Sequence, residues 1–394
     1  MALISNDRDE GATPPGGWPV PRSAYIHVPF CRHRCGYCNF SVVANRDEWI
    51  DRYLRAIEVE LTALNRPRVA TVFLGGGTPT HLPADSLVKL LRLVTSALDV
   101  SADAEISVEA NPEDINATTL AVLQDHGVNR ISLGVQSFDD SKLKILERGH
   151  TGDQARRIID QAATVVPNLS IDLIFSAPEE TLAIWNRDLE IACSLPIRHL
   201  STYALTFEKG TQFWNRRHRG ELFGNDDSLE VAMYQAARVS ARKVGLQQYE
   251  VSSFAADGFR CRHNMSYWHG DGWFAAGPGA ARFVNGLREV NHRSPATYLK
   301  RMENSLTPTA ESESITVEQF ARERAAFGVR LLDGIEISEF ESATGMDLLG
   351  FFADAIELSI SEELIERQGS VIRLTERGIL FADTVAARLL TADA

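Results

Sequence analysis

Three cysteines, Cys31, Cys35 and Cys38, lie within eight residues of one another near the start of the chain. Their C-x3-C-x2-C spacing places three thiols on one short loop. Three thiolates can bind three irons of a four-iron cubane and leave the fourth iron open for another molecule. Asn39 and Phe40 follow the third cysteine, so no adjacent thiol competes for that iron. The spacing therefore predicts a 4Fe–4S cluster with one open iron.

The alternative interpretation of this loop is a structural zinc site, with His27 or His33 as the fourth ligand. Zinc sites usually pair two C-x2-C halves that lie well apart, and this chain has no second half. The basic neighbours Arg32, His33 and Arg34 are expected to favour the thiolate form. An iron–sulfur cluster therefore remains the better interpretation of the loop.

Two further cysteines lie outside the loop. Cys193 falls in an expected helix and is most simply a core residue, whereas Cys261 is either a core residue or a thiol beside a haem. With five cysteines in all and no export signal, the chain does not have a disulfide framework.

Short β-branched runs alternate with amphipathic stretches from residue 24 onward. The expected strands are 24–28, 70–74, 105–110, 130–135, 169–174 and 199–204, and the expected helices are 48–64, 83–98, 117–126, 153–165 and 182–193. This alternation predicts an α/β fold with right-handed crossovers and a parallel sheet. Periodicity alone leaves an incomplete barrel and a doubly wound sheet open, but both bind ligands at the carboxyl ends of the strands.

Polar or glycine-rich motifs follow the expected strands. Gly75-Gly76-Gly77-Thr78-Pro79 follows the second strand, and Glu109-Ala-Asn-Pro112 follows the third. The later motifs are Gly134-Val-Gln136 after the fourth strand, Arg148-Gly-His150 beyond it, and Asp172 at the end of the fifth. Glycines let a backbone approach a ligand closely, so this edge of the sheet is the expected site.

The pattern changes after about residue 300. Helices are expected over 317–332, 347–366 and 375–390, with a hairpin over 367–374. This order predicts a mostly helical, winged-helix-like C-terminal domain over 301–394, a core with an extension over 23–300, and a disordered lead-in over 1–22. The two interpretations of the C-terminal domain are a lid or partner-docking surface and a structural cap, and we favour the cap.

Composition limits the class of protein. The net charge of −13 argues against a nucleic-acid partner, because phosphate binding requires a basic face. No apolar run approaches the about 18 residues of a membrane-spanning helix. The early acidic residues do not fit a signal peptide, so a cytoplasmic location is expected.

Together these motifs resemble the radical S-adenosylmethionine (SAM) superfamily, whose signature is C-x3-C-x2-C with an aromatic residue, here Tyr37, before the last cysteine. Over roughly residues 22–390 the chain looks like the haem chaperone (HemW-type) and oxygen-independent coproporphyrinogen III oxidase branch. The resemblance implies an incomplete parallel (β/α)6 TIM-like barrel. It also implies that the cluster donates one electron to a bound SAM, and that SAM is contacted by Tyr25, Tyr37, Gly76, Gly77, Thr78, Glu109, Gln136, Arg148 and Asp172.

The oxidase and chaperone branches differ at positions that can be compared with this sequence. Similar oxidases have a further cysteine where this chain has Phe40. They also have an N-terminal extension, whereas this chain is expected to reach its first strand after about two dozen disordered residues. His263-Asn264-Met-Ser-Tyr267-Trp268 matches a motif that chaperone-like members carry and that is associated with haem, so His263 is the candidate haem ligand; its alternative role is structural. One departure is Gly277-Pro278-Gly279-Ala280-Ala281, where relatives have Gly-Cys-Gly-Ala-His.

The expected function is therefore a haem chaperone that binds haem and passes it to an acceptor. The alternatives are coproporphyrinogen III oxidation, and radical chemistry on another substrate. The resemblance implies haem or porphyrin as the ligand, a flavodoxin- or ferredoxin-like electron donor, and a haem-acceptor protein.

Overall fold

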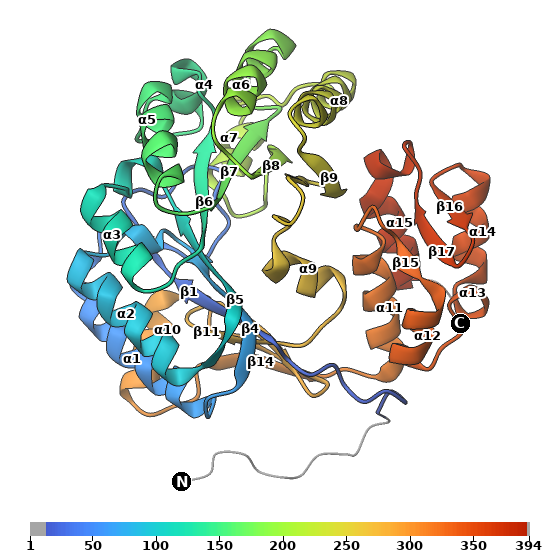
Figure 1. Ribbon diagram of the computed structural model, residues 1–394, viewed down its shortest axis with the longest axis horizontal. Coiled ribbons are helices and arrows are strands. Elements are labelled where there is room, and N and C mark those ends of the chain that lie inside the picture. The colour runs from blue at the N-terminus through green and yellow to red at the C-terminus, as the bar shows by residue number, and fades with distance from the viewer. Residues whose placement is uncertain (1–12, 392–394) are drawn as a thin grey trace.

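One twelve-stranded sheet forms the centre of the protein, whose computed structural model describes residues 13–391 (Figure 1). In spatial order its strands are β14 (Thr309–Ser314), β13 (Leu287–Asn291), β12 (Ala281–Val284), β11 (Trp273–Ala276), β1 (Ser23–Val28), β4 (Arg68–Gly76), β5 (Asp99–Ala110), β6 (Arg130–Gln136), β7 (Asn168–Phe175), β8 (His199–Ala204), β10 (Ser253–Ala255) and β9 (Gln247–Glu250).

The six expected strands are confirmed as β1 and β4 to β8, and each pairs with the next in parallel. β11 adds a seventh parallel strand beside β1, and the strands beyond both ends of this run are antiparallel. Within the described residues the end strands β14 and β9 do not pair with each other. The sheet is therefore a barrel that stays open on one side, as the family resemblance predicted.

Helices cover the outer face of the curved sheet (Figure 1). The five expected helices are confirmed as α1 (Ile50–Ala63), α2 (Ala84–Ala97), α3 (Ala117–Asp125), α5 (Gly152–Ala163) and α6 (Leu182–Ser194). In α1 the apolar stripe of Tyr53, Ile57 and Leu61 is fully buried, as its helical spacing predicts. The sequence analysis did not predict α4 (Asp140–Ile145), α7 (Gln212–His218), α8 (Asp227–Lys243), α9 (Arg262–Trp268) or α10 (Pro295–Glu303).

The C-terminal region has helices and a hairpin in the expected order, but the expected helices are shorter in the structure. The helix expected over 347–366 is two short helices that end at Ser361, and the α-helix expected over 375–390 begins at Ala382. Its elements are α11 (Val317–Gly328), β15 (Ile335–Glu336), α12 (Ile337–Thr344), α13 (Leu348–Phe351), α14 (Ala353–Ser361), β16 (Ile365–Gln368), β17 (Val371–Leu374) and α15 (Ala382–Thr391). β15 joins the hairpin in a small sheet of order β15-β17-β16, which is a winged-helix-like arrangement. Because β14 pairs with β13 of the main sheet, we place the start of this domain after Ser314.

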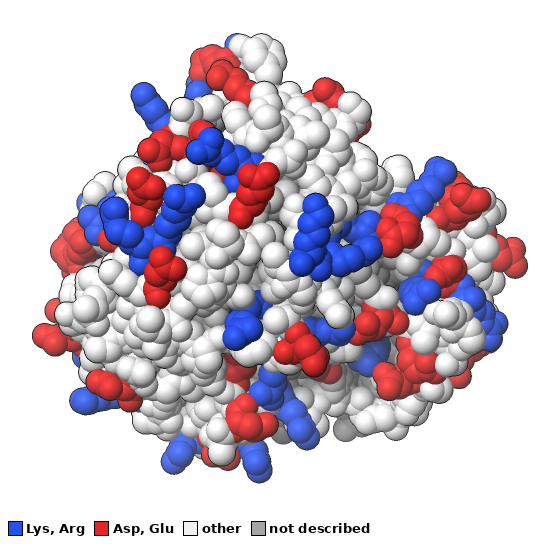
Figure 2. Space-filling model, turned by 45° about the horizontal axis from the view of Figure 1, so that its top comes forward, with Lys and Arg blue, Asp and Glu red and all other residues white. Residues whose placement is uncertain are grey.

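The first described residues pack on the core. Residues 1–12 of the expected lead-in lie outside the described residues. Residues 13–22 do not fit a disordered segment, because the ring of Trp18 makes edge contacts with Phe283 at 6.0 Å and Phe320 at 5.5 Å between centroids. Over the described residues no helix has the length and apolarity to cross a bilayer. On the face shown in Figure 2, basic and acidic side chains are interspersed.

Candidate cluster and cofactor site at the carboxyl ends of the strands

The cysteine loop is held at both of its ends. Cys31 ends β2 (Phe30–Cys31), which pairs in parallel with β3 (Val43–Ala44) just beyond the loop. Within the loop the Cys38 amide donates to the Cys35 carbonyl at 3.0 Å. All three thiols are free and half-buried. The structure therefore brings the three cysteines together on a fixed loop at the end of β1.

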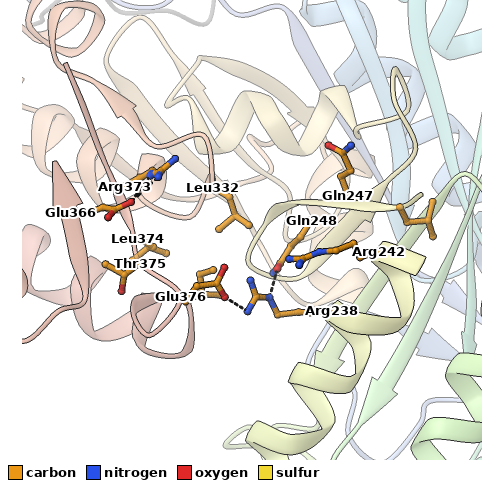
Figure 3. A pocket seen from close by; sticks show the side chains of 12 residues that line it. Arg238, Arg242, Gln247, Gln248, Leu332, Glu366, Arg373, Leu374, Thr375 and Glu376 are labelled. Atoms are coloured by element: carbon orange, nitrogen blue, oxygen red, sulfur yellow. Dashed lines mark hydrogen bonds and ion pairs between the residues drawn. The ribbon is translucent and has the colours of Figure 1, made fainter. Parts of the chain in front are cut away.

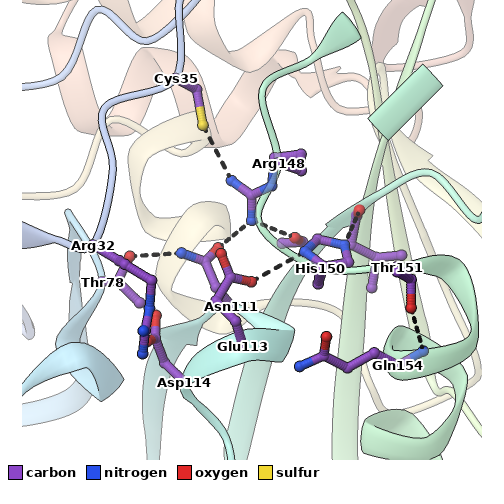
Figure 4. A network of polar contacts seen from close by, with 12 residues as sticks. Arg32, Cys35, Thr78, Asn111, Glu113, Asp114, Arg148, His150, Thr151 and Gln154 are labelled. Carbon is purple, nitrogen blue, oxygen red and sulfur yellow. Dashed lines mark hydrogen bonds and ion pairs between the residues drawn. The ribbon is translucent and has the colours of Figure 1, made fainter. Parts of the chain in front are cut away.

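Donors from two other loops reach the sulfurs. The Thr78 hydroxyl donates to Cys31 Sγ at 3.7 Å. Arg148 Nη1 donates to Cys35 Sγ at 3.6 Å, as Figure 4 shows. Burial raises the pKa of the Cys31 thiol to about 12, and the Thr78 hydroxyl and the Arg148 cation act in the opposite direction. Burial also raises the pKa of Cys38. A bound metal cluster is the kind of cation that holds buried thiols in the thiolate form.

The expectation that Arg32, His33 and Arg34 all act on the thiols is corrected by their contacts. Arg32 pairs with the buried Asp114 at 3.0 Å, and His33 lies 3.5 Å from Glu147. Of the three, only Arg34 lowers the pKa of a loop thiol, that of Cys38. Arg148, from a distant motif, is the cation that lowers the pKa of both Cys31 and Cys38, and Arg34 adds to this effect at Cys38.

The zinc alternative fits the structure poorly. Both ring nitrogens of His27 are engaged, with the Tyr25 hydroxyl at 3.1 Å and the Ser41 carbonyl at 2.9 Å. In the described part of the chain, no three His, Cys, Asp or Glu side chains are arranged to hold a single metal ion. A cubane presents a different iron to each thiolate, so its ligands need not converge on one point.

The glycine motif after β4 lies directly against the cysteine loop. Gly76 has a φ of +98°, and a Cβ there would lie 2.3 Å from the imidazole of His27. The Gly77 amide donates to the Val28 carbonyl at 2.8 Å, and a Cβ on Gly77 would lie 2.6 Å from the same oxygen. Only glycine permits this approach at both positions.

A hydrogen-bond network centred on Arg148 joins four loops (Figure 4). Besides Cys35, the guanidinium contacts Asn111 Oδ1 at 2.5 Å and the Gly134 carbonyl at 2.8 Å through Nη2. Asn111 in turn donates to the Thr78 hydroxyl at 2.8 Å. One side chain therefore fixes the loops after β1, β4, β5 and β6 relative to one another.

Two more residues extend this network. His150 contacts Glu113 at 3.0 Å through Nδ1 and the Val135 carbonyl at 3.0 Å through Nε2. Burial alone raises the pKa of Glu113, but the His150 hydrogen bond and the Arg148 charge outweigh it and lower that pKa to about 2. The sequence analysis did not assign Asn111, Glu113 or His150 to the site, although all three lie in or beside motifs that follow strands.

Gln136 and Tyr37 are the remaining predicted residues beside the cysteine loop, at the carboxyl ends of the strands. Gln136 has a φ of +66°, an uncommon conformation for a residue with a side chain, and it ends β6. A Cβ on Gly134 would lie 3.1 Å from its Nε2, so the glycine leaves room for it. Tyr37 packs edge-on against Phe213 with 6.0 Å between ring centroids. We call the cysteine loop and the side chains Tyr37, Thr78, Asn111, Glu113, Gln136, Arg148 and His150 the mouth network.

The other expected SAM contacts lie deeper, in a cavity of about 200 Å³ inside the barrel. This barrel cavity is lined by Tyr25, Phe73, Glu109, Arg130, Ser132, Asp172, Ser201, Tyr203, His263, Asn264 and Tyr267. Burial raises the pKa of Glu109 to about 7, although its carboxylate accepts from the Gly76 amide at 2.9 Å. Burial likewise raises the pKa of Asp172, against the pull of Arg130 and hydrogen bonds from serines.

Arg130, which the sequence analysis missed, is the cation of the barrel cavity. Its side chain is 2% exposed, and its Nε and Nη1 have no hydrogen-bond partner in the described structure. Glu105 and Asp172 are the nearby carboxylates that favour its charge. The available signal was alternation, because Arg130 and Ser132 are two residues apart on β6 and face the same side.

His263 is buried at the wall of this cavity, on α9. Its Nδ1 lies 2.9 Å from the Thr71 hydroxyl and its Nε2 lies 2.9 Å from the Tyr267 hydroxyl. Burial lowers its pKa to about 3, so the ring is neutral. Cys261, left undecided by the sequence, is fully buried and its thiol contacts Glu105 at 3.7 Å, which makes it a core residue of the described chain.

The altered loop 277–281 is packed closely against buried residues of the core. The buried carboxylate of Glu60 accepts from the Gly277 amide at 2.9 Å, and a Cβ on Gly279 would lie 2.4 Å from the Ser41 hydroxyl. Glycines in the left-handed region hold the loop against the segment that follows the cysteines.

A larger cleft of about 560 Å³ lies between α8, β9 and the C-terminal hairpin (Figure 3). One ion pair spans it, Arg238–Glu376 at 2.6 Å, and a second, Arg373–Glu366 at 2.7 Å, joins the two strands of the hairpin on one wall. It shares no lining residue with the barrel cavity. None of the predicted site residues lines it, so the sequence motifs converge on the barrel and not on this cleft.

The comparisons with known proteins agree with this geometry. The radical SAM superfamily profile matches residues 25–190, and the HemN C-terminal domain profile matches residues 315–381. The chain is 33% identical to the heme chaperone HemW of Bacillus subtilis, over 94% of this chain and 99% of that one. It is 33% identical to the heme chaperone HemW of Mycobacterium tuberculosis strain H37Rv, over 95% of this chain and 97% of that one.

A more distant sequence relative is the mitochondrial radical S-adenosyl methionine domain-containing protein 1 of Danio rerio, 31% identical over 94% of this chain and 87% of its own. Among solved structures, the coproporphyrinogen III oxidase HemN of Escherichia coli superposes with a TM-score of 0.83 at 21% identity, over 95% of this chain and 91% of that one. That likeness shows a common fold. By its full-length sequence similarity, the chain belongs to the HemW family of the radical SAM superfamily.

Proposed function

We propose that this protein binds haem and passes it to an acceptor, using a site built beside a 4Fe–4S cluster and SAM. The radical SAM superfamily implies the cluster and SAM. The full-length relatives that are named heme chaperones support the haem. The observation that carries the proposal is that α9, which holds the His263 to Trp268 motif, lines the same barrel cavity as Glu109 and Asp172.

Cys31, Cys35 and Cys38 are the proposed cluster ligands. When bound, the cluster and SAM supply one-electron chemistry. Arg148 and Thr78 orient two of the sulfurs through their contacts at 3.6 and 3.7 Å. The half-buried loop and the closely packed glycines keep bulk water away from them.

The SAM contacts are proposed from both regions of the site. Gly76, Gly77 and Thr78 present backbone and hydroxyl groups beside the cysteine loop, and Tyr37, Gln136 and Arg148 surround it. Tyr25, Glu109 and Asp172 lie deeper, where buried carboxylates are suited to accept hydrogen bonds from hydroxyl groups of a ligand. Burial raises the pKa of Glu109, and a hydroxyl donor from a ligand would stabilise its carboxylate form.

Haem binding at His263 requires a local change. Both of its ring nitrogens are hydrogen-bonded, so an iron could bind only after the Tyr267 hydroxyl or the Thr71 hydroxyl has left. The cavity of about 200 Å³ is smaller than the roughly 300–1,000 Å³ of typical small-molecule sites. Because His263 and Tyr267 both lie on α9, a movement of this helix away from β4 would separate Nδ1 from the Thr71 hydroxyl and enlarge the cavity that α9 lines, while the Tyr267 contact would remain.

Haem titration of the anaerobically reconstituted protein, with and without SAM, tests this proposal. We expect a stable Soret shift that is lost in His263→Ala and kept in His269→Ala, an exposed histidine one residue beyond α9. A Soret shift that survives in His263→Ala contradicts the assignment of the ligand. Conversion of coproporphyrinogen III to protoporphyrinogen would instead assign the oxidase activity to the chain.

A further inference from the structure

Arg130 is a buried cation whose hydrogen-bond donors the described chain leaves unused. It is 2% exposed and lines the barrel cavity. Its Nε and Nη1 have no hydrogen-bond partner among the described residues. Leaving the donors of a buried charged group without partners costs free energy. A ligand that brings hydrogen-bond acceptors to this guanidinium therefore gains affinity from it.

The carboxylates whose charge acts on Arg130 accept hydrogen bonds from other donors. Glu105 accepts from the first two amides of α9, at 3.0 and 3.1 Å, and Asp172 accepts from the Ser132 hydroxyl at 3.2 Å. Both carboxylates favour the charged form of Arg130 without a hydrogen bond to its Nε or Nη1. Glu109, the second carboxylate that lines the cavity, accepts from a backbone amide at 2.9 Å. The charge of Arg130 is therefore balanced, while its donors remain available.

Arg130 lies far from the cysteine loop along the sheet. It is the first residue of β6, and Gln136 of the mouth network is the last. About 20 Å of extended strand separates their Cα atoms, at roughly 3.3 Å per residue. The three cysteines and Arg148 are not among the residues that line the barrel cavity. A group bound beside the cysteines therefore lies toward the other end of β6 from Arg130.

Arg130 and His263 line the same cavity from different elements, a strand in the middle of the sheet and the helix α9. They are close enough for the charge of Arg130 to lower the pKa of His263, although burial is the larger cause. A movement of α9 would displace His263 and leave Arg130 in place, because β6 is paired on both sides. One ligand can therefore contact a fixed cation and a movable imidazole.

We infer that Arg130 binds a propionate carboxylate of the haem in the barrel cavity. This inference rests on the proposed function and assigns the orientation of its ligand. Haem carries its iron at the centre of the ring and its carboxylates at one edge, so His263 and Arg130 would hold it at two points. A planar guanidinium is suited to this role because it binds a carboxylate through parallel hydrogen bonds. The carboxylate of SAM is the alternative source of the same chemistry, and the test separates the two.

The test compares haem with haem dimethyl ester, in which the propionates are esterified and carry no charge. Each is titrated into the anaerobically reconstituted protein and followed by the Soret band. We expect the wild type to bind the ester about tenfold more weakly than haem, because charge-assisted hydrogen bonds to Arg130 are lost. Arg130→Met should bind haem about tenfold more weakly and should bind haem and the ester equally, and Arg130→Lys should keep part of the difference. Arg157→Met, a change of an exposed arginine on α5, is the matched control and should behave as the wild type.

Equal binding of haem and the ester by the wild type overturns the inference, and this comparison needs no variant to fold. A preference for haem that persists undiminished in Arg130→Met also overturns it, because another residue then binds the propionates. Calorimetry with SAM gives the last comparison: a tenfold loss of SAM affinity in Arg130→Met with unchanged haem affinity assigns Arg130 to SAM instead. If the wild type gives no Soret shift with haem at all, the proposed function itself fails, so the two failures are distinguishable.

Discussion

The mouth network and the barrel cavity are adjacent, but their electrostatics are opposite. In the mouth network Glu113 is paired with His150 and its pKa falls to about 2. In the cavity, four residues earlier in the chain, burial raises the pKa of Glu109 to about 7. Arg148 makes three hydrogen bonds and leaves only its Nε without a partner, whereas both Nε and Nη1 of Arg130 lack a partner in the described structure. The mouth network is therefore tied together by its own hydrogen bonds, and the barrel cavity holds a buried guanidinium with nitrogens available to a ligand.

This difference indicates that the mouth network is suited to a permanent group and the barrel cavity to an exchangeable ligand. A prearranged network is suited to hold a permanent group such as a cluster, because its ligands must not move. A cavity with unsatisfied buried charge is less stable when empty and gains from a ligand that supplies partners. The predictions below separate these two behaviours.

The largest effect is expected from the cysteine loop. Cys35→Ser should lose nearly all iron and sulfide after anaerobic reconstitution, because a hydroxyl is a poor substitute for a thiolate ligand. Iron and sulfide analysis measures this change. Cys193→Ser, on α6, is the matched control and should keep its iron; equal loss in both variants would contradict the assignment.

The next effect is expected at the centre of the mouth network. Arg148→Met removes charged hydrogen bonds to Cys35, Asn111 and the Gly134 carbonyl, each of which is worth about 1.5–3 kcal/mol. We expect SAM affinity to fall at least tenfold by calorimetry. Arg157→Met, an exposed residue on α5, provides the same substitution away from the site, and an equal loss there would remove the special role of Arg148.

The two glutamates should respond to pH with opposite sign. The raised pKa of Glu109 means that stability is lost as the pH rises from about 4.5 to about 7, by on the order of 3 kcal/mol. Glu109→Gln should therefore stabilise the ligand-free protein above about pH 7 and have little effect near pH 4.5. Urea unfolding at several pH values measures this difference.

Glu113 is the natural comparison in the same experiment. Its lowered pKa contributes stability above about pH 4.5 that is lost as the pH falls toward about 2. Glu113→Gln should therefore destabilise the protein at neutral pH. If both variants shift stability in the same direction, the contrast between mouth and interior is wrong.

The smallest effect concerns the hydrogen bond that occupies His263. Tyr267→Phe frees Nε2 of the imidazole, at the loss of one hydrogen bond worth about 0.5–1.5 kcal/mol. We expect haem affinity to rise by roughly twofold to tenfold in a Soret titration. Tyr203 lines the same cavity without contacting His263, so Tyr203→Phe should leave the haem affinity unchanged. Weaker haem binding in Tyr267→Phe would contradict the idea that the Tyr267 hydroxyl competes with haem for His263.

Much of the fold could be predicted because its signals are local. β-branched runs and the Tyr53, Ile57 and Leu61 stripe depend on neighbours in the sequence, and all six parallel strands follow from them. β11 could not be found in this way, because it is a strand of four residues that lies far along the chain from β1, its parallel neighbour. β15 is two residues long and carries no periodicity.

The motifs predicted which residues gather at this edge of the sheet, and the residues that were not predicted are joined to them by contacts between loops far apart in the sequence. Arg148 was assigned, but the Asn111 side chain that links it to Thr78 was not, because that contact joins three motifs. The basic neighbours of the cysteines suggested an effect on all three thiols, whereas side-chain direction sends Arg32 to Asp114 instead. Alternation along β6 was the available signal for Arg130.

Electron paramagnetic resonance of the reduced, anaerobically reconstituted protein, recorded before and after addition of SAM, tests the central claim most directly. If three thiolates hold a cluster whose fourth iron is open at the mouth of the barrel, a 4Fe–4S signal should appear and SAM should shift its g values. Zinc in place of iron and sulfide, or a cluster signal that SAM leaves unchanged, would contradict the account.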